Sequence, residues 1–194
     1  MRLIGCDISR YQNSEEIPRN VRFVILKATE GCTHVDLKMQ AHLEYIAKYH
    51  KDNLPIIGFY HFMTRNNTAD AQADHFLNTI KPHIGKCLMV LDIEGMAAAD
   101  VKASIRARQF CDHIKQRTKV RPVLYTSRAY LNKFTDCDAH LWVANYNVKE
   151  VPQNQIPEKW RNKPYMWQFT SNPMDLDMFY GARGELAAWA LPND

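Results

Sequence analysis

The chain has 194 residues, of which 46% are hydrophobic and 24% are charged, and its formal net charge at pH 7 is +4. This length and composition suit one well-buried domain and exclude an extensively disordered chain. Lysines and arginines are spread along the chain rather than gathered into a run, so we expect no nucleic-acid binding. No window reaches the roughly 20 apolar residues of a membrane span, so we expect no membrane insertion.

The five cysteines lie far apart and form no CxxC pair, which indicates reduced thiols in a protein made in the cytoplasm. The first residues, MRLIGCDIS, contain too few apolar side chains for a signal peptide. Any extracellular role would therefore need another exit route. We expect the chain to act as a monomer.

Short apolar runs that end in polar residues recur along the chain and are typical of strands. Eight such runs occupy residues 3–9, 23–31, 55–62, 87–95, 122–127, 141–147, 165–170 and 175–181. Segments with helical spacing lie at 36–51, 67–81 and 97–117, and a short helix is expected near 127–133. This alternation predicts parallel strands with right-handed crossovers. Five β/α units followed by three plain strands predict an irregular, TIM-like (β/α)5β3 barrel of the α/β class, in a single domain.

The carboxyl ends of the strands carry the active site in such barrels. Polar groups stand near these ends in the predicted strands: Asp7, Lys27, Glu30, Tyr60, His61, Asp92, Glu94, Tyr125, Asn145, Tyr146, Gln168 and Asp175. One polar residue at a strand end is ordinary, but the repetition over so many strands predicts a functional rim.

The run LMVLDIEGM places Asp92 and Glu94 two residues apart, so that both project to one side of an extended chain. Crowded carboxylates cost electrostatic energy and are typical of sites that use them. Paired carboxylates with aromatic neighbours suggest glycoside hydrolysis, in which one acid protonates the leaving oxygen. We expect Glu94 to hold its proton near neutral pH because Asp92 beside it stays ionised.

Aromatic residues near the rim, namely Tyr60, Tyr125, Trp142, Tyr146 and Trp167, offer flat faces for sugar rings, although some of them serve packing only. A metal site built from Asp7, His61, Asp92 and Glu94 is the alternative chemistry. The sequence has no HxH or HExxH motif to support it, so we expect neither a metal nor another cofactor.

Seven motifs in order resemble those of the glycoside hydrolase family 25 lysozymes, the Chalaropsis-type muramidases. They are DISRYQ (7–12), FVILKATEG (23–31), GFYHF (58–62), LDIEG (91–95), LWVANY (141–146), MWQF (166–169) and DLDMF (175–179). The resemblance covers essentially the whole chain. It departs from the family in the segment NSEEIP after Gln12, which lacks a tryptophan often found there, and in the short connection between Gln168 and Asp175.

The resemblance implies an enzyme that cleaves the β-1,4 bond between N-acetylmuramic acid and N-acetylglucosamine in peptidoglycan without a metal. Glu94 would be the proton donor. Asp92 would either orient the 2-acetamido group of the substrate or act on the opposite side of the sugar. Asp7 and Asp175 would complete the acidic cluster, with Asp177 as the alternative to Asp175.

The whole of 1–194 would then be one catalytic domain without a separate wall-binding domain. The missing signal peptide favours an endolysin-like role in bacterial lysis, with access to the wall by holin-type release or cell lysis. Two other hypotheses stay open: a carbohydrate-binding barrel that has lost turnover, and a metal-dependent polysaccharide hydrolase.

Overall fold

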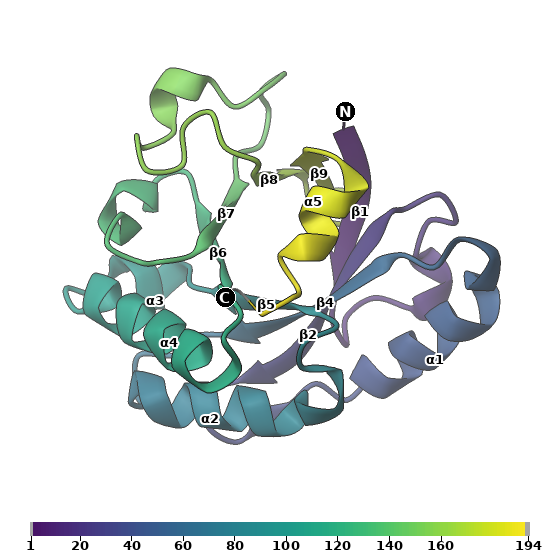
Figure 1. Cartoon of the computed structure of the whole chain (residues 1–194), viewed down its shortest axis with the longest axis horizontal. Coiled ribbons are helices and arrows are strands. Elements are labelled where there is room, and N and C mark those ends of the chain that lie inside the picture. Colours follow the sequence, from purple (N-terminus) through teal and green to yellow (C-terminus); the bar gives the residue numbers. More distant parts are fainter. Residues whose placement is uncertain (1, 193–194) are drawn as a thin grey trace.

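An eight-stranded barrel forms the centre of the structure, a computed structural model that describes residues 2–192 (Figure 1). Its strands are β1 (Arg2–Ile8), β2 (Phe23–Glu30), β4 (Ile56–Phe62), β5 (Leu88–Asp92), β6 (Val123–Ser127), β7 (His140–Ala144), β8 (Met166–Thr170) and β9 (Leu176–Tyr180). They are hydrogen-bonded in this order, and the pairing of β9 with β1 closes the barrel. Neighbours from β1 to β8 are parallel, whereas β9 is antiparallel to both β8 and β1.

All eight predicted strands and the predicted barrel class are confirmed. The short strand β3 (His34–Val35), which pairs antiparallel with the end of β2, was not predicted. Two residues give no apolar pattern from which a strand can be recognised.

Helices cover one part of the barrel surface and leave the rest to loops (Figure 1). The α-helices are α1 (Met39–Tyr49), α2 (Ala69–Thr79), α3 (Gly95–Ala99), α4 (Ala103–Thr118) and α5 (Arg183–Ala188). Short 3-10 turns are η1 (Ser14–Glu16), η2 (Lys51–Asn53), η3 (Lys81–His83), η4 (Leu131–Phe134) and η5 (Gln153–Gln155). Thus α-helices follow β2, β4 and β5, but only 3-10 turns follow β1 and β6. The predicted β/α units are therefore incomplete at β1 and β6, which no α-helix follows directly.

The single helix predicted over 97–117 is two helices, because Asp100 interrupts it. The Asp100 carboxylate accepts a hydrogen bond from the backbone N–H of Lys102 at 2.7 Å, and its carbonyl accepts one from Ala103 at 3.1 Å. These contacts satisfy free N–H groups at the start of α4. Helix α5 was not predicted.

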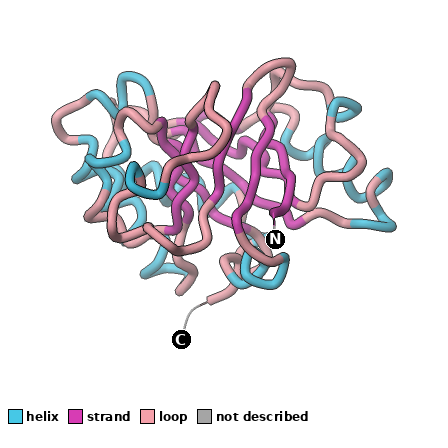
Figure 2. Tube along the Cα trace, turned by 90° about the horizontal axis from the view of Figure 1, so that it is seen from above, coloured by secondary structure: helices cyan, strands magenta, loops and turns pink. Residues whose placement is uncertain are grey.

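The barrel interior is filled by alternate residues of the strands, as the period of two requires. This cluster includes Leu3, Phe23, Ile25, Leu88, Val90, Val123, Met166 and Phe179. Leu186 and Trp189, in and just after α5, pack into the same cluster, so that α5 closes one end of the barrel (Figure 2). Gly5 makes room for the interior, since a Cβ there would lie 2.3 Å from the ring of Phe23.

The carboxyl ends of the parallel strands form the other end of the barrel. Because β9 runs antiparallel, its amino-terminal end lies at that same rim, and Asp177 in β9 pairs with Gln168 in β8 and Gly5 in β1. Asp175, just before β9, is thereby brought to the rim. Within residues 2–192, no helix is long and apolar enough to cross a membrane.

Candidate active site

A cavity of about 270 Å³ opens at this rim. Ten of the thirteen predicted site residues line it: Asp7, Lys27, Tyr60, Asp92, Glu94, Tyr125, Trp142, Tyr146, Gln168 and Asp175. Ser9, Tyr11 and Phe62 also line it and were not predicted to do so. Residues far apart in the sequence therefore converge because they lie in or next to barrel strands whose ends meet at this rim.

The alternation of strand residues explains which side chains reach the cavity. Asp7, Ser9 and Tyr11 are spaced two apart, as are Tyr60 and Phe62 and the pair Asp92 and Glu94. The two-residue period of the strands thus continues into the loops that follow them. That signal was present in the sequence and could have identified Ser9, Tyr11 and Phe62.

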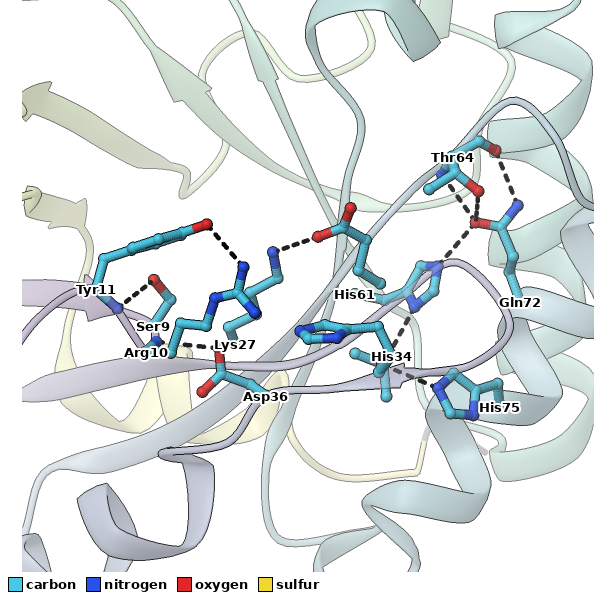
Figure 3. Close-up of polar contacts among 12 residues, drawn as sticks. Ser9, Arg10, Tyr11, Lys27, His34, Asp36, His61, Thr64, Gln72 and His75 are labelled. Atoms are coloured by element: carbon cyan, nitrogen blue, oxygen red, sulfur yellow. Dashed lines mark hydrogen bonds and ion pairs between the residues drawn. The ribbon is translucent and has the colours of Figure 1, made fainter.

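His61 lies between Tyr60 and Phe62 in β4, so its side chain points to the other side of the strand and does not reach the cavity. Its side chain is fully buried and lies between Thr29 Oγ1, at 2.8 Å, and Gln72 Oε1 of α2, at 3.1 Å (Figure 3). Burial lowers the pKa of His61 to about 4. The imidazole is therefore neutral, and its hydrogen bonds link β4 to β2 and to α2.

Asn145 and Glu30 also lie outside the cavity lining. Asn145 acts through its backbone, where its carbonyl accepts a hydrogen bond from Trp167 Nε1 at 2.8 Å. Glu30 forms an ion pair with Lys27, with Oε2 2.7 Å from Nζ (Figure 3). Glu30 thus contacts Lys27, the one basic residue among those that line the cavity, and its charge adds to the rise in the pKa of Asp92.

Gln168 connects the acidic side of the cavity to its aromatic side. Its Nε2 donates to Oδ2 of Asp7 at 2.7 Å. Its Oε1 accepts from the hydroxyl of Tyr125 at 2.8 Å and from the hydroxyl of Tyr146. Since both tyrosines donate to the oxygen, the amide orientation is fixed with its NH₂ group toward Asp7.

The pKa of Asp7 is raised to about 8, first by burial and then by the charge of Asp175, while the hydrogen bond from Gln168 opposes the rise. Asp175 is half-buried and lines the cavity, whereas Asp177 is fully buried and does not line it. Asp177 accepts a hydrogen bond from Trp142 Nε1 at 2.9 Å, and burial followed by the charge of Asp7 raises its pKa well above the usual range. Of the two candidates, Asp175 is the one that a ligand in the cavity can contact.

Asp92 is the last residue of β5 and only 7% exposed. Burial raises its pKa well above the usual range, and the charges of Glu94 and Asp7 raise it further. Burial thus favours the protonated form of Asp92, against the expectation that Asp92 stays ionised, while the expected rise in the pKa of Glu94 is present. The strand end buries Asp92 more deeply than Glu94, which stands two residues beyond it. Its Oδ1 is buried without a hydrogen-bond partner among residues 2–192.

Glu94 reaches the cavity from the loop after β5, in an extended conformation that begins α3. Burial raises its pKa above the usual value, the charge of Asp175 raises it further, and Lys27 lowers it. Glu94 can thus hold a proton at a higher pH than an exposed glutamate. Within the described part of the chain, no three His, Cys, Asp or Glu side chains are arranged to hold a metal ion.

Comparisons with known proteins agree with this geometry. The family model described as "Glycosyl hydrolases family 25" matches residues 6–178. The chain is 31% identical over 154 residues to the autolytic lysozyme of Clostridium acetobutylicum, an alignment that covers 75% of this chain and 46% of that protein.

Solved structures of similar fold include a family 25 lysozyme from Aspergillus fumigatus and a muramidase from Acremonium alcalophilum. The first has a TM-score of 0.79 and the second 0.77, each at 26% identity and covering 98% of this chain and 100% of the other. The similarity thus extends over the whole barrel.

Proposed function

Because the chain belongs to glycosyl hydrolase family 25, we propose that it is a lysozyme of the N-acetylmuramidase type. The bond it cleaves is the β-1,4 linkage between N-acetylmuramic acid and N-acetylglucosamine in bacterial peptidoglycan. The similar proteins named above support this proposal, since they are themselves called lysozymes or muramidases.

The observation that carries the proposal is the convergence of four carboxyl groups on one aromatic-lined cavity. Asp7, Asp92, Glu94 and Asp175 all line it, and Lys27 is its single basic residue. Such an excess of acidic groups suits a transition state in which the sugar becomes cationic. A barrel that only bound carbohydrate would have no use for this arrangement, which raises the pKa of each of the four carboxyls.

Glu94 is the proton donor in this account. The glycosidic C–O bond breaks while the proton of Glu94 passes to the leaving oxygen; water finally supplies OH to the anomeric carbon, and its other proton restores the acid. Its raised pKa and its place in the cavity lining suit this role.

Asp92 lines the cavity with its side chain only slightly exposed. Contact with the 2-acetamido group of the substrate and action from the opposite side of the sugar are the two roles open to it. Asp7 and Asp175 place carboxyl oxygens around the developing cation, and Gln168 holds Asp7 in place.

We propose that the enzyme acts as a monomer at the bacterial cell wall during lysis, with neither a metal nor another cofactor. The site residues proposed here come entirely from one chain, and one cation, Lys27, is supplied by the protein itself. Holin-type release or cell lysis would give access to the wall.

The test is mass spectrometry of the fragments that the purified protein releases from peptidoglycan. The proposal predicts N-acetylmuramic acid at the new reducing ends. New N-acetylglucosamine reducing ends would identify a glucosaminidase, and free amino termini would identify a peptidase or amidase. Absence of any cleavage while glycan still binds would favour the non-catalytic barrel.

A further inference from the structure

The loop after β1, residues 9–13, which we call the β1 loop, carries Tyr11 to the rim of the cavity. Tyr11 lines the cavity and is nevertheless 74% exposed. The Arg10 guanidinium lies over its ring, 5.0 Å from the centroid, and Arg10 Nη2 donates to the Tyr11 hydroxyl at 2.9 Å (Figure 3). A ring that stays largely open at the edge of a cavity offers an apolar surface to a ligand that extends out of the cavity.

The β1 loop has no α-helix directly behind it, since only the 3-10 turn η1 follows β1. Inside the loop, Gln12 Oε1 accepts hydrogen bonds from the backbone N–H and the hydroxyl of Ser9, at 2.9 and 3.2 Å. These contacts bend the loop on itself. Its attachment to other parts of the molecule comes from the segment that follows β3.

Asp36 is the central point of this attachment. It follows β3 directly, and its N–H donates to the carbonyl of Ala28 in β2 at 2.9 Å, which anchors Asp36 to the barrel. Its side chain is buried, and Oδ2 accepts from the backbone N–H of Arg10 at 3.0 Å (Figure 3). Oδ1 accepts from the backbone N–H of Lys38 at 2.9 Å. A carboxylate acceptor strengthens both bonds. Because Arg10 directly precedes Tyr11, the first bond fixes the backbone from which the Tyr11 ring projects.

Two further contacts reach the β1 loop from Lys38 and from α1. Lys38 Nζ donates to the carbonyl of Gln12 at 3.0 Å and to Oδ1 of Asn13 at 3.1 Å. His42 of α1 is buried, and its Nε2 donates to the carbonyl of Ser9 at 3.1 Å. Burial lowers the pKa of His42, so the ring is neutral near pH 7. The β1 loop is therefore held at both ends by side chains that do not line the cavity.

We propose that Tyr11 contacts the bound glycan and that Asp36 and Lys38 are positioning residues, which act on the substrate through Tyr11. A loop that is already fixed loses less conformational freedom when a ligand binds. The short strand β3 then has a role in function, because it places Asp36 against the β1 loop. This inference rests on the proposed muramidase function and adds to it the residues that orient one wall of the substrate cavity.

Kinetics with soluble, peptide-free glycan strands of peptidoglycan provide the test, since the reducing ends released give KM and kcat separately. Tyr11→Ala removes the proposed contact. Asp36→Asn keeps the shape of the side chain but leaves one of the two backbone N–H groups facing an NH₂ group. Lys38→Ala removes the Nζ contacts with the β1 loop and leaves the carboxylate of Asp36 in place. The last two substitutions are each made alone and together with Tyr11→Ala.

Asp100→Asn is the matched control. Like Asp36, Asp100 accepts a hydrogen bond from the backbone N–H two residues further on, that of Lys102 at 2.7 Å, and it lies just before a helix, here α4. Asp100 belongs neither to the cavity lining nor to the β1 loop. The control thereby separates a weakened helix start, which both aspartate substitutions cause, from loss of the contact with the β1 loop. Denaturant unfolding of every variant reports the effect on stability.

We expect Tyr11→Ala to raise KM at least about fivefold with kcat within about twofold, because a contact made equally before and in the transition state changes KM alone. Asp36→Asn and Lys38→Ala should each raise KM at least about twofold in the wild-type background. In the Tyr11→Ala background neither should raise KM further, because no ring is left to position. Asp100→Asn should keep the KM and kcat of the wild type.

An unchanged KM in Tyr11→Ala would overturn the inference, since the ring would then not contact the glycan. An unchanged KM in both positioning variants would overturn it as well. So would losses that multiply in the double variants or that fall on kcat rather than KM, because Asp36 and Lys38 would then act on the fold or on another part of the site. If Asp36→Asn does not fold, the same criteria apply to Lys38→Ala alone. Failure of the wild type to cleave the glycan strands would instead contradict the proposed function.

Discussion

Gln168 donates a hydrogen bond to Asp7 at 2.7 Å across the mouth of the barrel, from β8 to β1. The two residues are 161 positions apart in the sequence. Gln168 thereby links Asp7 to the hydroxyl groups of Tyr125 and Tyr146. The contact also fixes the orientation of the Asp7 carboxyl group, whose charged form burial destabilises.

Replacing Gln168 with glutamate should therefore damage the site without changing its shape. The introduced carboxylate would still accept from Tyr125 and Tyr146, but it could not donate to Asp7 and would add negative charge beside it. We expect kcat to fall at least about tenfold, since a buried polar group left without its hydrogen bond costs about 1–3 kcal/mol. Steady-state kinetics would measure this, and circular dichroism would verify folding. Gln155→Glu, at an exposed position, is the matched control; unchanged kinetics in a folded Gln168→Glu variant would contradict the role given to this contact.

Asp175 should set the alkaline limit of activity. Its charge raises the pKa of Glu94, so Asp175→Asn removes a cause of that rise and the pKa falls. Activity requires the protonated acid, and its alkaline limb should accordingly move to lower pH. Asp175, and not Asp92, is the carboxyl group whose charge raises the pKa of Glu94, so Asp92→Asn should shift the limb less while still impairing turnover.

Profiles of kcat/KM against pH for both variants would test this order. Asp136→Asn, at an exposed position, is the control and should leave the limb unchanged. A limb that moves to higher pH in Asp175→Asn, or that moves further in Asp92→Asn, would show that the charges are assigned wrongly.

Tyr60 and His61 are neighbours in β4 that face opposite sides of the barrel wall, and they should respond differently to substitution. Tyr60→Leu removes a side chain from the cavity, and we expect at least about a tenfold loss of kcat/KM, of the order of one specific contact. His61→Leu leaves Thr29 and Gln72 without their buried partner and should lower the free energy of unfolding by about 1–3 kcal/mol. Its activity on peptidoglycan per folded molecule should stay within about threefold of the wild type, because His61 does not line the cavity.

Denaturant unfolding and kinetics at a temperature where both variants are folded would separate the two effects. A folded His61→Leu protein that cleaves peptidoglycan as poorly as Tyr60→Leu would mean that His61 acts on the substrate after all.

Tyr60 and His61 show how far the sequence predicts this site. Hydrophobic runs located all eight barrel strands, and the polar residues after them located the cavity. The period of two then decides which of two adjacent polar residues faces inward, and it separates Tyr60 from His61 and Tyr146 from Asn145. Whether Asp92 or Glu94 is the more buried depends on where β5 ends, and the apolar pattern of the sequence does not define that position. Helix α5 closes the barrel through Trp189, a long-range contact with no local signal.

Activity should survive removal of metal ions. The proposed chemistry uses carboxyl groups and one lysine, all from the protein. Incubation with excess EDTA followed by desalting should leave the rate of peptidoglycan clearing within about twofold, in contrast to a site whose metal generates the nucleophile. Loss of activity that Zn²⁺ or Mg²⁺ restores would support the metal-dependent hydrolase instead.

The central claim is that Glu94 protonates the leaving oxygen, and the most direct measurement compares Glu94→Gln with the wild type on two leaving groups. The variant keeps the shape of the side chain but has no transferable proton. The account predicts that kcat/KM falls at least about 10²-fold on the peptide-free tetrasaccharide of alternating N-acetylglucosamine and N-acetylmuramic acid. An aryl β-glycoside of N-acetylglucosaminyl-N-acetylmuramic acid with a strongly acidic phenol as leaving group should lose far less, because that leaving group needs no proton. Glu158→Gln, at an exposed position, should match the wild type on both substrates. Equal losses of Glu94→Gln on the two substrates, or near wild-type turnover of Glu94→Gln while Asp175→Asn is inactive, would contradict the assignment of Glu94 as the proton donor.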